Sequence, residues 1–127
     1  MPKKRVRDLA KQAVYQKRWY ESHKRAHVAN VMRRKRQMAE DGYQKLFAYL
    51  SDHPCVDCGE KDVVVLEFDH VRGKKSANVV HLIVRGYLWE SVEKEIAKCE
   101  VRCCNCHRRA TTRRAGWRRH TYALLAQ

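Results

Sequence analysis

Two short segments carry the residues with the clearest chemistry. Asp69 and His70 directly follow a largely apolar stretch, residues 63–68, and His107 directly follows Cys106. A carboxylate and an imidazole can form an open site for a divalent ion, with water in the remaining positions. An imidazole is also suited to take a proton from water near neutral pH. We therefore expect Asp69, His70 and His107 to meet in one site.

Four of the six cysteines form two Cys-x-x-Cys pairs, and these are Cys55, Cys58, Cys103 and Cys106. Two thiols at this spacing can bind one metal from a tight turn, and Gly59 suits the backbone angles of such a turn. In a reducing compartment this spacing indicates a metal site, so we expect a tetrahedral structural zinc. Buried free thiols and a disulfide are the alternatives. Of the remaining two, we expect Cys99 to be a small buried residue and Cys104 to be no ligand.

The segments around these residues have the patterns of short strands and helices. Residues 63–68 are rich in β-formers, which predicts a strand that delivers Asp69 and His70 at its end. Residues 78–98 have helical spacing with a break at Gly86, and Ser91 is a candidate N-cap. The mixture of strand and helix patterns predicts an α+β fold.

A further helix is expected after the second cysteine pair. If it starts near Asn105, one face would carry His107, Thr111, Arg114 and Arg118. An imidazole and several guanidinium groups would then share one face, which suits a helix that lies against a nucleic-acid backbone.

The N-terminal part of the chain is strongly basic. Thirteen Lys and Arg lie between Lys3 and Arg36, against the two acids Asp8 and Glu21, and the aromatic residues Tyr15, Trp19 and Tyr20 are interspersed. Apolar positions are sparse and small, so we expect a helix or helix pair that holds no core by itself. We interpret residues 1–41 as an arm that binds the DNA backbone through charge. A solvated or disordered basic arm is the alternative.

Asp41-Gly42 is expected to break the arm from the second domain, residues 42–127. The following residues, through Leu50, return to helical spacing, and Pro54 ends that helix. We place the start of the second domain between residues 42 and 54. It would contain the cysteine pairs, the site residues and the basic C-terminal helix.

The net charge of +14 indicates a polyanionic partner. Nucleic acid is the first candidate and a membrane surface the second. The sequence has no run of about 18 apolar residues that could span a membrane. Its first residues, Met1-Pro2-Lys3-Lys4-Arg5, do not have the pattern of a signal peptide. We therefore expect a cytoplasmic protein with no membrane association.

In combination, these motifs resemble those of a known family. The order Cys-x-x-Cys, Asp-His, Cys-x-x-Cys-His is similar to that of the zinc-containing HNH endonucleases, which are common among bacteria and their phages, and the resemblance covers about residues 54–115. It implies a ββα-metal core in the cytoplasm of a bacterial host. By position, Asp69 and His107 would hold a catalytic Mg²⁺, Mn²⁺ or other divalent ion, and His70 would be the general base. The four cysteines would hold the structural zinc.

One position departs from the family pattern. An asparagine upstream of the metal-binding histidine usually braces the loop that carries the base, and Lys98 occupies that position here. Asn78 and Asn105 are the available asparagines, and neither stands where the pattern requires it.

The residues and the resemblance together predict a metal-dependent endonuclease or nickase that acts on double-stranded DNA. We expect basic residues of the last helix and of the arm to bind the backbone, namely Arg108, Arg109, Arg113, Arg114, Lys17, Arg18, Arg33 and Arg34. A non-catalytic zinc module that binds nucleic acid is the alternative, and RNA is a weaker candidate substrate. Many members of the family act with phage packaging proteins or as mobile elements, but the sequence selects neither.

Overall fold

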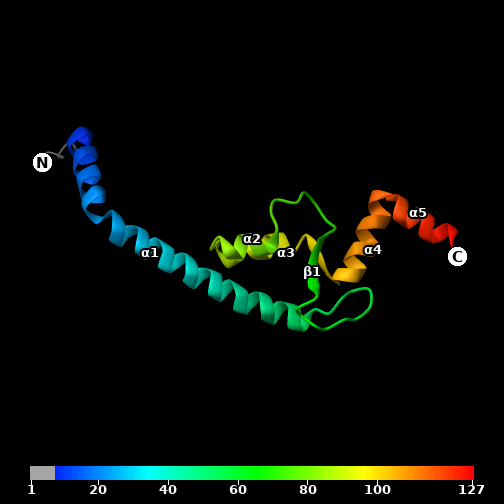
Figure 1. The fold of residues 1–127 in the computed structure, drawn as a ribbon. Helices are drawn as coiled ribbons and strands as arrows, with labels where there is room; N and C mark the ends of the chain where they lie inside the picture. The colour runs from blue at the N-terminus through cyan, green and yellow to red at the C-terminus, as the bar shows by residue number, and fades with distance from the viewer. Residues whose placement is uncertain (1–7) are drawn as a thin grey trace, which may run out of the picture. The chain divides into compact units, whose positions relative to one another are not determined.

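The computed structural model describes residues 8–127, so the first seven residues of the predicted arm lie outside the described part. The chain combines helices with a small two-stranded sheet (Figure 1), which confirms the predicted α+β class. In order, the elements are α1 (Leu9–Asp52), β1 (Leu66–His70), α2 (Val79–Val84), α3 (Trp89–Ile96), β2 (Cys99–Cys103), α4 (Cys104–Ala115) and α5 (Arg118–Leu125). The chain divides into two units, residues 1–35 and 36–127, which are described separately.

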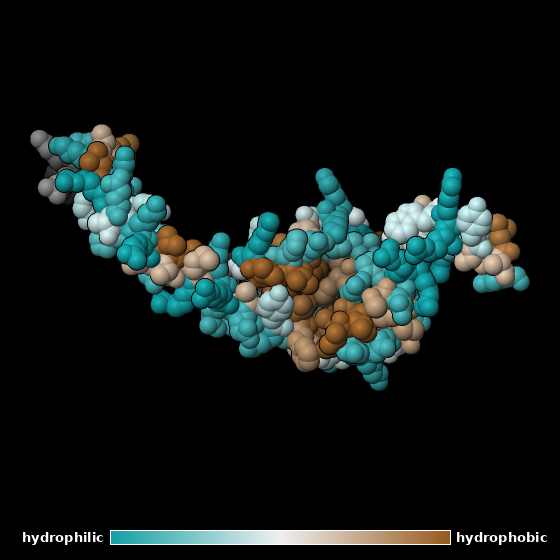
Figure 2. Space-filling view, viewed as in Figure 1, coloured by the Kyte–Doolittle hydropathy of each residue, from teal (hydrophilic) through white to brown (hydrophobic). Residues whose placement is uncertain are grey.

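In the described part of the first unit, α1 is one exposed helix. Every residue from Asp8 to Lys35 is exposed to solvent, and the surface there is mainly hydrophilic (Figure 2). This agrees with the prediction of a helix with no core of its own, because its apolar residues do not form a buried stripe.

The predicted helix break at Asp41-Gly42 is wrong, since α1 continues through these residues to Asp52. Gly42 is buried, and a Cβ atom at this position would lie 3.0 Å from Cγ2 of Ile83 in α2. The glycine therefore allows the close approach of α2 instead of ending the helix. Leu46 and Leu50, on the same side of α1, are also buried.

Helices α2 and α3 pack together, and α3 also packs against β2. Ile83 and Val92 are the most completely buried large side chains of the core. The predicted break at Gly86 is confirmed, because this residue has a positive φ of 71° between the two helices. The predicted N-cap at Ser91 is wrong: α3 begins at Trp89, with Leu88 in the capping position.

Strands β1 and β2 are antiparallel, with Leu66 opposite Cys103 and His70 opposite Cys99. The strand begins later than predicted, because residues 63–65 form a turn. The side chain of Asp62 accepts the backbone N–H of Val64 at 3.0 Å in that turn. Asp69 and His70 therefore lie within the strand instead of following it.

This position has a consequence for the site, since neighbouring residues of a strand point to opposite faces. One face of the sheet carries charged residues, namely Glu67, Asp69, Glu100 and Arg102. The other face carries apolar residues and thiols together with His70, namely Leu66, Phe68, Cys99, Val101 and Cys103.

Helix α4 starts directly after β2 and packs against both strands. Cys103 is its N-cap and accepts the backbone N–H of Cys106 at 3.4 Å. Gly116, with a φ of 61°, ends the helix, so Arg118 belongs to α5 and does not extend the face of α4 that was predicted to include it. Between residues 8 and 127, no helix is both long and apolar enough to cross a membrane.

Candidate functional site

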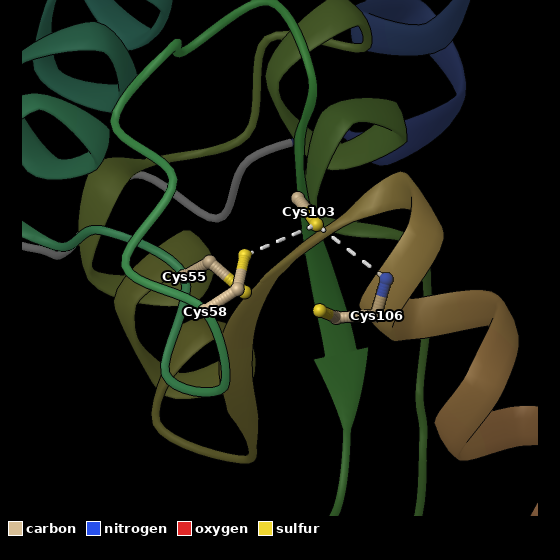
Figure 3. A group of neighbouring side chains, drawn as sticks. All are labelled: Cys55, Cys58, Cys103 and Cys106. Atoms are coloured by element: carbon tan, nitrogen blue, oxygen red, sulfur yellow. Dashed lines mark hydrogen bonds between the residues drawn. The ribbon is translucent and has the colours of Figure 1, made fainter.

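The four paired cysteines come together in one cluster (Figure 3). Cys55 and Cys58 lie in the loop before β1, Cys103 ends β2 and Cys106 lies in the first turn of α4. Their Sγ atoms all lie within 4.8 Å of one another. Gly59, directly after the first pair, has a φ of 77°, so the turn uses the backbone freedom expected of glycine.

The spacing of these sulfur atoms fits a tetrahedral ion. Four sulfur atoms at about 2.3 Å from a zinc ion would be separated by about 3.8 Å. The Sγ atoms of Cys58 and Cys103 are 3.7 Å apart, whereas a disulfide would bring them to about 2.05 Å. All four are free thiols, which excludes the disulfide alternative in this structure. The cluster could therefore hold a metal ion such as zinc.

The thiols of the cluster differ in acidity. Burial alone would raise the pKa of the Cys55 thiol, but backbone N–H groups around it outweigh this and lower the pKa to about 6. The neighbouring Cys103 thiol is the main cause that raises the pKa of Cys106 to about 12. One thiolate therefore disfavours the next, and a bound cation would relieve this repulsion as the protons leave.

The two remaining cysteines, Cys99 and Cys104, are not part of the four-thiol cluster. Cys99 is buried, and burial raises the pKa of its thiol to about 11, which agrees with its expected role as a small apolar residue. Cys104 is exposed on the first turn of α4.

Asp69 is buried on the charged face of the sheet and bonds to two guanidinium groups. Arg102 donates from Nη1 to Oδ2 at 2.7 Å, and Arg114 donates from Nη2 to Oδ1 at 2.6 Å. Burial would raise the pKa of this carboxyl, but the hydrogen bond and charge of Arg114, together with the bond from Arg102, lower it. The carboxylate is thus ionised and already holds positive charge at both oxygens.

Arg102 links Asp69 to the cysteine loop. It also bonds to Asp57, which lies between the two cysteines of the first pair, with 2.7 Å between Nε and Oδ2, and to Glu100 at 2.7 Å. The hydrogen bond with Asp57 is the largest cause that raises the pKa of Arg102. The charged face of the sheet and the thiol cluster are therefore connected through one side chain.

His107 lies beside Asp69, as predicted. Its Nε2 is 3.5 Å from Oδ1 of Asp69, and its Nδ1 is 2.6 Å from Oε2 of Glu67. An ionised carboxylate can only accept, so Nδ1 is assigned as the N–H donor to Glu67. Nε2 faces Asp69, and it donates to that carboxylate when the ring carries both protons.

These two atoms have a separation that suits a shared ion. Neighbouring ligands of a divalent ion bound at about 2.1 Å are about 3 Å apart, compared with 3.5 Å here. A carboxylate on the far nitrogen of a metal-binding histidine is the usual second partner of such a ligand. In this structure the guanidinium of Arg114 lies 2.6 Å from the same oxygen of Asp69.

His70 lies on the opposite face of β1 and has a different partner. Its Nε2 is 2.9 Å from Oε1 of Glu95, which is buried in α3. The same oxygen accepts the backbone N–H groups of Ser76 and Ala77 at 2.9 and 3.3 Å. Glu95 is thus buried between two basic side chains, His70 and Lys98.

Lys98 lies at the base of the loop that follows His70. Its Nζ donates to the carbonyl of Lys74 at 2.9 Å, to Oγ of Ser76 at 3.0 Å and to Oε2 of Glu95 at 2.7 Å. Of the two asparagines considered for the bracing role, Asn78 precedes α2 without a side-chain capping bond, and Asn105 is exposed on α4.

A pocket of about 610 Å³ brings the two histidines to one cavity. His70 and Glu67 line it from β1, His107 lines it from α4, and Asn78 and His81 line it from α2 and the residue before it. Asp69, one of the three predicted site residues, is not in the lining and reaches the cavity only through its contact with His107.

Most of the predicted backbone-binding residues are exposed and carry no ion pair among residues 8–127. This holds for Lys17, Arg18, Arg33, Arg34, Arg108, Arg109 and Arg113. Arg114 differs, because it pairs with Asp69 although its side chain is 46% exposed. In the described part of the first unit the ion pair is Lys11 with Asp8, so most of its positive charge is uncompensated.

The sequence interpretation missed three residues that contact the predicted site. Two are carboxylates, Glu67 and Glu95, which bond to His107 and His70. The third is Arg102, which bonds to Asp69. Glu67 could have been found, because residues two apart in a strand share a face and Asp69 was already singled out.

Comparison with known proteins adds no relative: no family model matches the chain, and no curated protein or solved structure matches it significantly.

Proposed function

We propose that this protein is a metal-dependent endonuclease or nickase that hydrolyses phosphodiester bonds in double-stranded DNA. The four-cysteine cluster would hold a structural zinc, and Asp69 with His107 would hold a catalytic divalent ion. The order of β1, β2 and α4, with the cysteine pairs at their ends, agrees with the ββα-metal core that the sequence resemblance implies. The predicted domains, with an arm at 1–41 and a nuclease domain at 42–127, remain part of this proposal.

The zinc would replace a larger apolar core. The second unit has few fully buried large side chains, and the thiol cluster joins the loop at residues 55–58 to the end of β2 and the start of α4. A structural zinc contributes folding free energy directly because the unfolded chain has no preformed site. It would therefore hold the sheet and α4 in the relative positions that the charged site requires.

His70 would act as the general base. Its Nε2 is bonded to Glu95. Nδ1 is therefore the atom that would accept a proton from the attacking water, through its lone pair. The water oxygen forms a bond to phosphorus as the bond from phosphorus to the 3′ oxygen breaks, which leaves 5′-phosphate and 3′-hydroxyl ends. The bound divalent ion would supply positive charge for the phosphate and the departing oxygen.

The remaining residues hold the substrate and the ligands. Glu67 keeps the His107 ring in the tautomer that directs Nε2 to Asp69. The unpaired guanidinium groups of Arg108 and Arg113 on α4 would bind phosphates on either side of the scissile bond. The basic residues of α1 would extend this contact along the backbone, where the free energy comes from counterion release.

One observation carries the proposal. His107 has a carboxylate on each ring nitrogen, Glu67 at Nδ1 and Asp69 at Nε2, and shares a pocket with His70. In a metal-binding histidine one ring nitrogen donates to a carboxylate and the other faces the ion, and Glu67 and Asp69 are placed for these two roles.

The experiment is a plasmid assay. Supercoiled DNA incubated with the protein and Mg²⁺ or Mn²⁺ should be nicked or linearised, EDTA should stop the reaction, and His107→Ala should reduce the rate by at least about 100-fold because it removes a ligand of the ion. His120→Ala is the matched control, since its side chain has no hydrogen bond among residues 8–127. Equal rates for His107→Ala and the wild type would refute the assignment.

A non-catalytic module that binds nucleic acid is the second candidate, and the bonds of Asp69 favour it. Both of its oxygens are taken by guanidinium groups, which is the arrangement of a structural ion pair. In that case the charged face stabilises the fold and the exposed arginines bind DNA. Salt-sensitive binding without cleavage by any divalent ion would select this candidate.

A further inference from the structure

We propose that Glu95 and Lys98 are positioning residues for His70: Glu95 fixes the orientation and tautomer of the ring, and Lys98 fixes the loop that follows it. The inference deepens the proposed function, because it assigns to this pair the bracing that an asparagine would otherwise provide. It also makes a statement about the folded protein that can be tested without DNA.

First, Glu95 is buried, and four hydrogen-bond donors contact its carboxylate. Its side chain is 4% exposed. Oε1 accepts from His70 and from the backbone N–H groups of Ser76 and Ala77, and Oε2 accepts from Lys98. With four donors at fixed positions, the carboxylate has one orientation, and the imidazole bonded to it is held with it.

The second step is the tautomer. Burial would raise the pKa of Glu95, but the bonds from Lys98, Ser76 and Ala77 outweigh it and lower the pKa to about 2, so the group is ionised at neutral pH. An ionised carboxylate only accepts hydrogen bonds, so Nε2 of His70 must be the donor. When the ring is neutral, its lone pair is then on Nδ1.

The third step is the accessibility of that lone pair. Within residues 8–127, the hydrogen bonds of His70 use Nε2 alone, and no buried side-chain nitrogen or oxygen lacks a partner. Nδ1 is therefore not buried, and His70 lines the pocket shared with His107. The carboxylate thus fixes one nitrogen inside the protein and leaves the other available to a water molecule.

The fourth step is the loop. The carbonyl of Lys98 accepts the backbone N–H groups of Val71 and Arg72 at 2.9 and 3.0 Å, and its Nζ donates to the carbonyl of Lys74 and to Ser76. One residue therefore ties down both ends of the segment 71–76 directly after His70. Lys98 occupies the sequence position of the family's asparagine, and its side chain and backbone make the bracing contacts.

A buried ion pair with no other role is the competing interpretation, since Glu95 and Lys98 are also one helical turn apart. That role predicts loss of stability when either is changed, but it predicts no effect on the state of the His70 ring. The discriminating readout is therefore the ring itself.

The experiment uses ¹⁵N-labelled full-length protein with zinc, without DNA, at a pH where the imidazole is neutral. We expect the Nε2 proton of His70 to give a sharp downfield resonance, assigned by its loss in His70→Gln, because its hydrogen bond protects it from exchange. Glu95→Ala should remove this resonance, and Glu95→Gln should keep it, because the amide oxygen can still accept from His70, Ser76 and Ala77. The control is Glu93→Ala, which removes an exposed carboxylate from the same helix.

The same variants are compared in single-turnover cleavage. Loss of a residue that orients a catalytic group costs about 10–100-fold, so Glu95→Ala should lower the rate at saturating protein by that factor without weakening DNA binding. Lys98→Met should lower it less, and Lys94→Met, an exposed lysine of α3, should have no effect. If Glu95→Ala does not fold, Glu95→Gln provides the test instead. The proposal then requires that Glu95→Gln retain both the His70 resonance and most of the wild-type cleavage rate.

Two results would overturn the proposal. One is a His70 resonance that persists in Glu95→Ala or that shows the proton on Nδ1 in the wild type. The other is loss of the resonance in Glu95→Ala with an unchanged cleavage rate. If the wild type does not cleave DNA at all, the proposed function fails, while the resonance still decides whether Glu95 orients the ring.

Discussion

The two imidazoles of the site each have a carboxylate of their own, but in opposite settings. Glu95, the partner of His70, is 4% exposed and is held by backbone N–H groups and Lys98. Glu67, the partner of His107, is 51% exposed, and the buried carboxylate beside this ring is Asp69. The two histidines thus meet their partners on opposite faces of the same short strand.

Under the proposed function, the difference separates two requirements of a hydrolytic site. A base must hold its ring in one orientation, which a buried and fully bonded carboxylate provides. A metal ligand must exchange water and ions, which requires an open side. Asp69 is intermediate, because it is buried but shares Oδ1 between His107 and the half-exposed Arg114. The predictions below alter one side of this comparison at a time.

The largest effect is expected from the thiol cluster, because it supports both faces of the sheet. Cys58→Ser should unfold the protein or lower its thermal midpoint by tens of degrees, since a structural metal contributes folding free energy directly. Circular dichroism and metal analysis measure the outcome. Cys104→Ser is the matched control, being exposed and outside the cluster. A folded Cys58→Ser protein with no bound zinc would contradict this.

Asp69→Asn should selectively destabilise the charged face. Breaking a buried ion pair costs about 3–5 kcal/mol, and the loss here should be about 2–3 kcal/mol because Arg102 keeps Asp57 and Glu100 as partners. Urea unfolding gives the value. Asp57→Asn, a half-exposed partner of the same arginine, should cost less than about 1 kcal/mol. Equal losses of unfolding free energy in Asp69→Asn and Asp57→Asn would contradict the prediction that the buried carboxylate contributes more than the half-exposed one.

The pH dependence of the free energy of unfolding should report on Glu95, which lies on the His70 side of the sheet. The pKa of Glu95 is lowered from 4.5 to about 2 in the folded state, so its contribution is complete above pH 4.5 and is lost as the pH falls toward 2. The difference in free energy of unfolding between the wild type and Glu95→Gln should therefore shrink over this range. A difference that is constant with pH would mean that the charge of Glu95 does not stabilise the fold.

The smallest effect on stability is expected in the first unit. Arg33 and Arg34 are exposed and unpaired within the described residues, so replacing both by Ala should leave the free energy of unfolding within about 0.5 kcal/mol. DNA binding should weaken, and the slope of log K against log salt should decrease by about 0.9 for each phosphate that the variant no longer neutralises. Gln37→Ala is the uncharged control. An unchanged slope would place the DNA-binding residues elsewhere.

Much of the site was predictable because its signals are local. The spacing of Cys55, Cys58, Cys103 and Cys106 predicts a shared metal site without knowledge of the fold, and the structure brings the four together, where they could hold an ion. The proximity of Asp69 to His107 was also predicted. The three residues expected in one site are connected through His107, which contacts Asp69 and shares a pocket with His70. Asp69 and His70 lie on opposite faces, because side chains alternate along a strand and the strand was expected to end before them.

The residues that were missed depend on the register of the sheet. His70 lies opposite Cys99, and Glu95 lies one helical turn before Cys99, so the contact appears only once β1 and β2 are paired. The close packing at Gly42 is a similar case. A glycine between helical patterns can end a helix or admit a neighbour, and only the position of Ile83 distinguishes these.

The central claim is that His70 is the base, and single-turnover cleavage with the protein in saturating excess over DNA tests it most directly. His70→Ala should bind DNA with wild-type affinity and cleave it at least about 100-fold more slowly, as expected for the loss of a general base. His120→Ala should match the wild type in both. Cleavage by His70→Ala at the full rate, with Mg²⁺ or Mn²⁺ present and EDTA still inhibitory, would contradict the assignment.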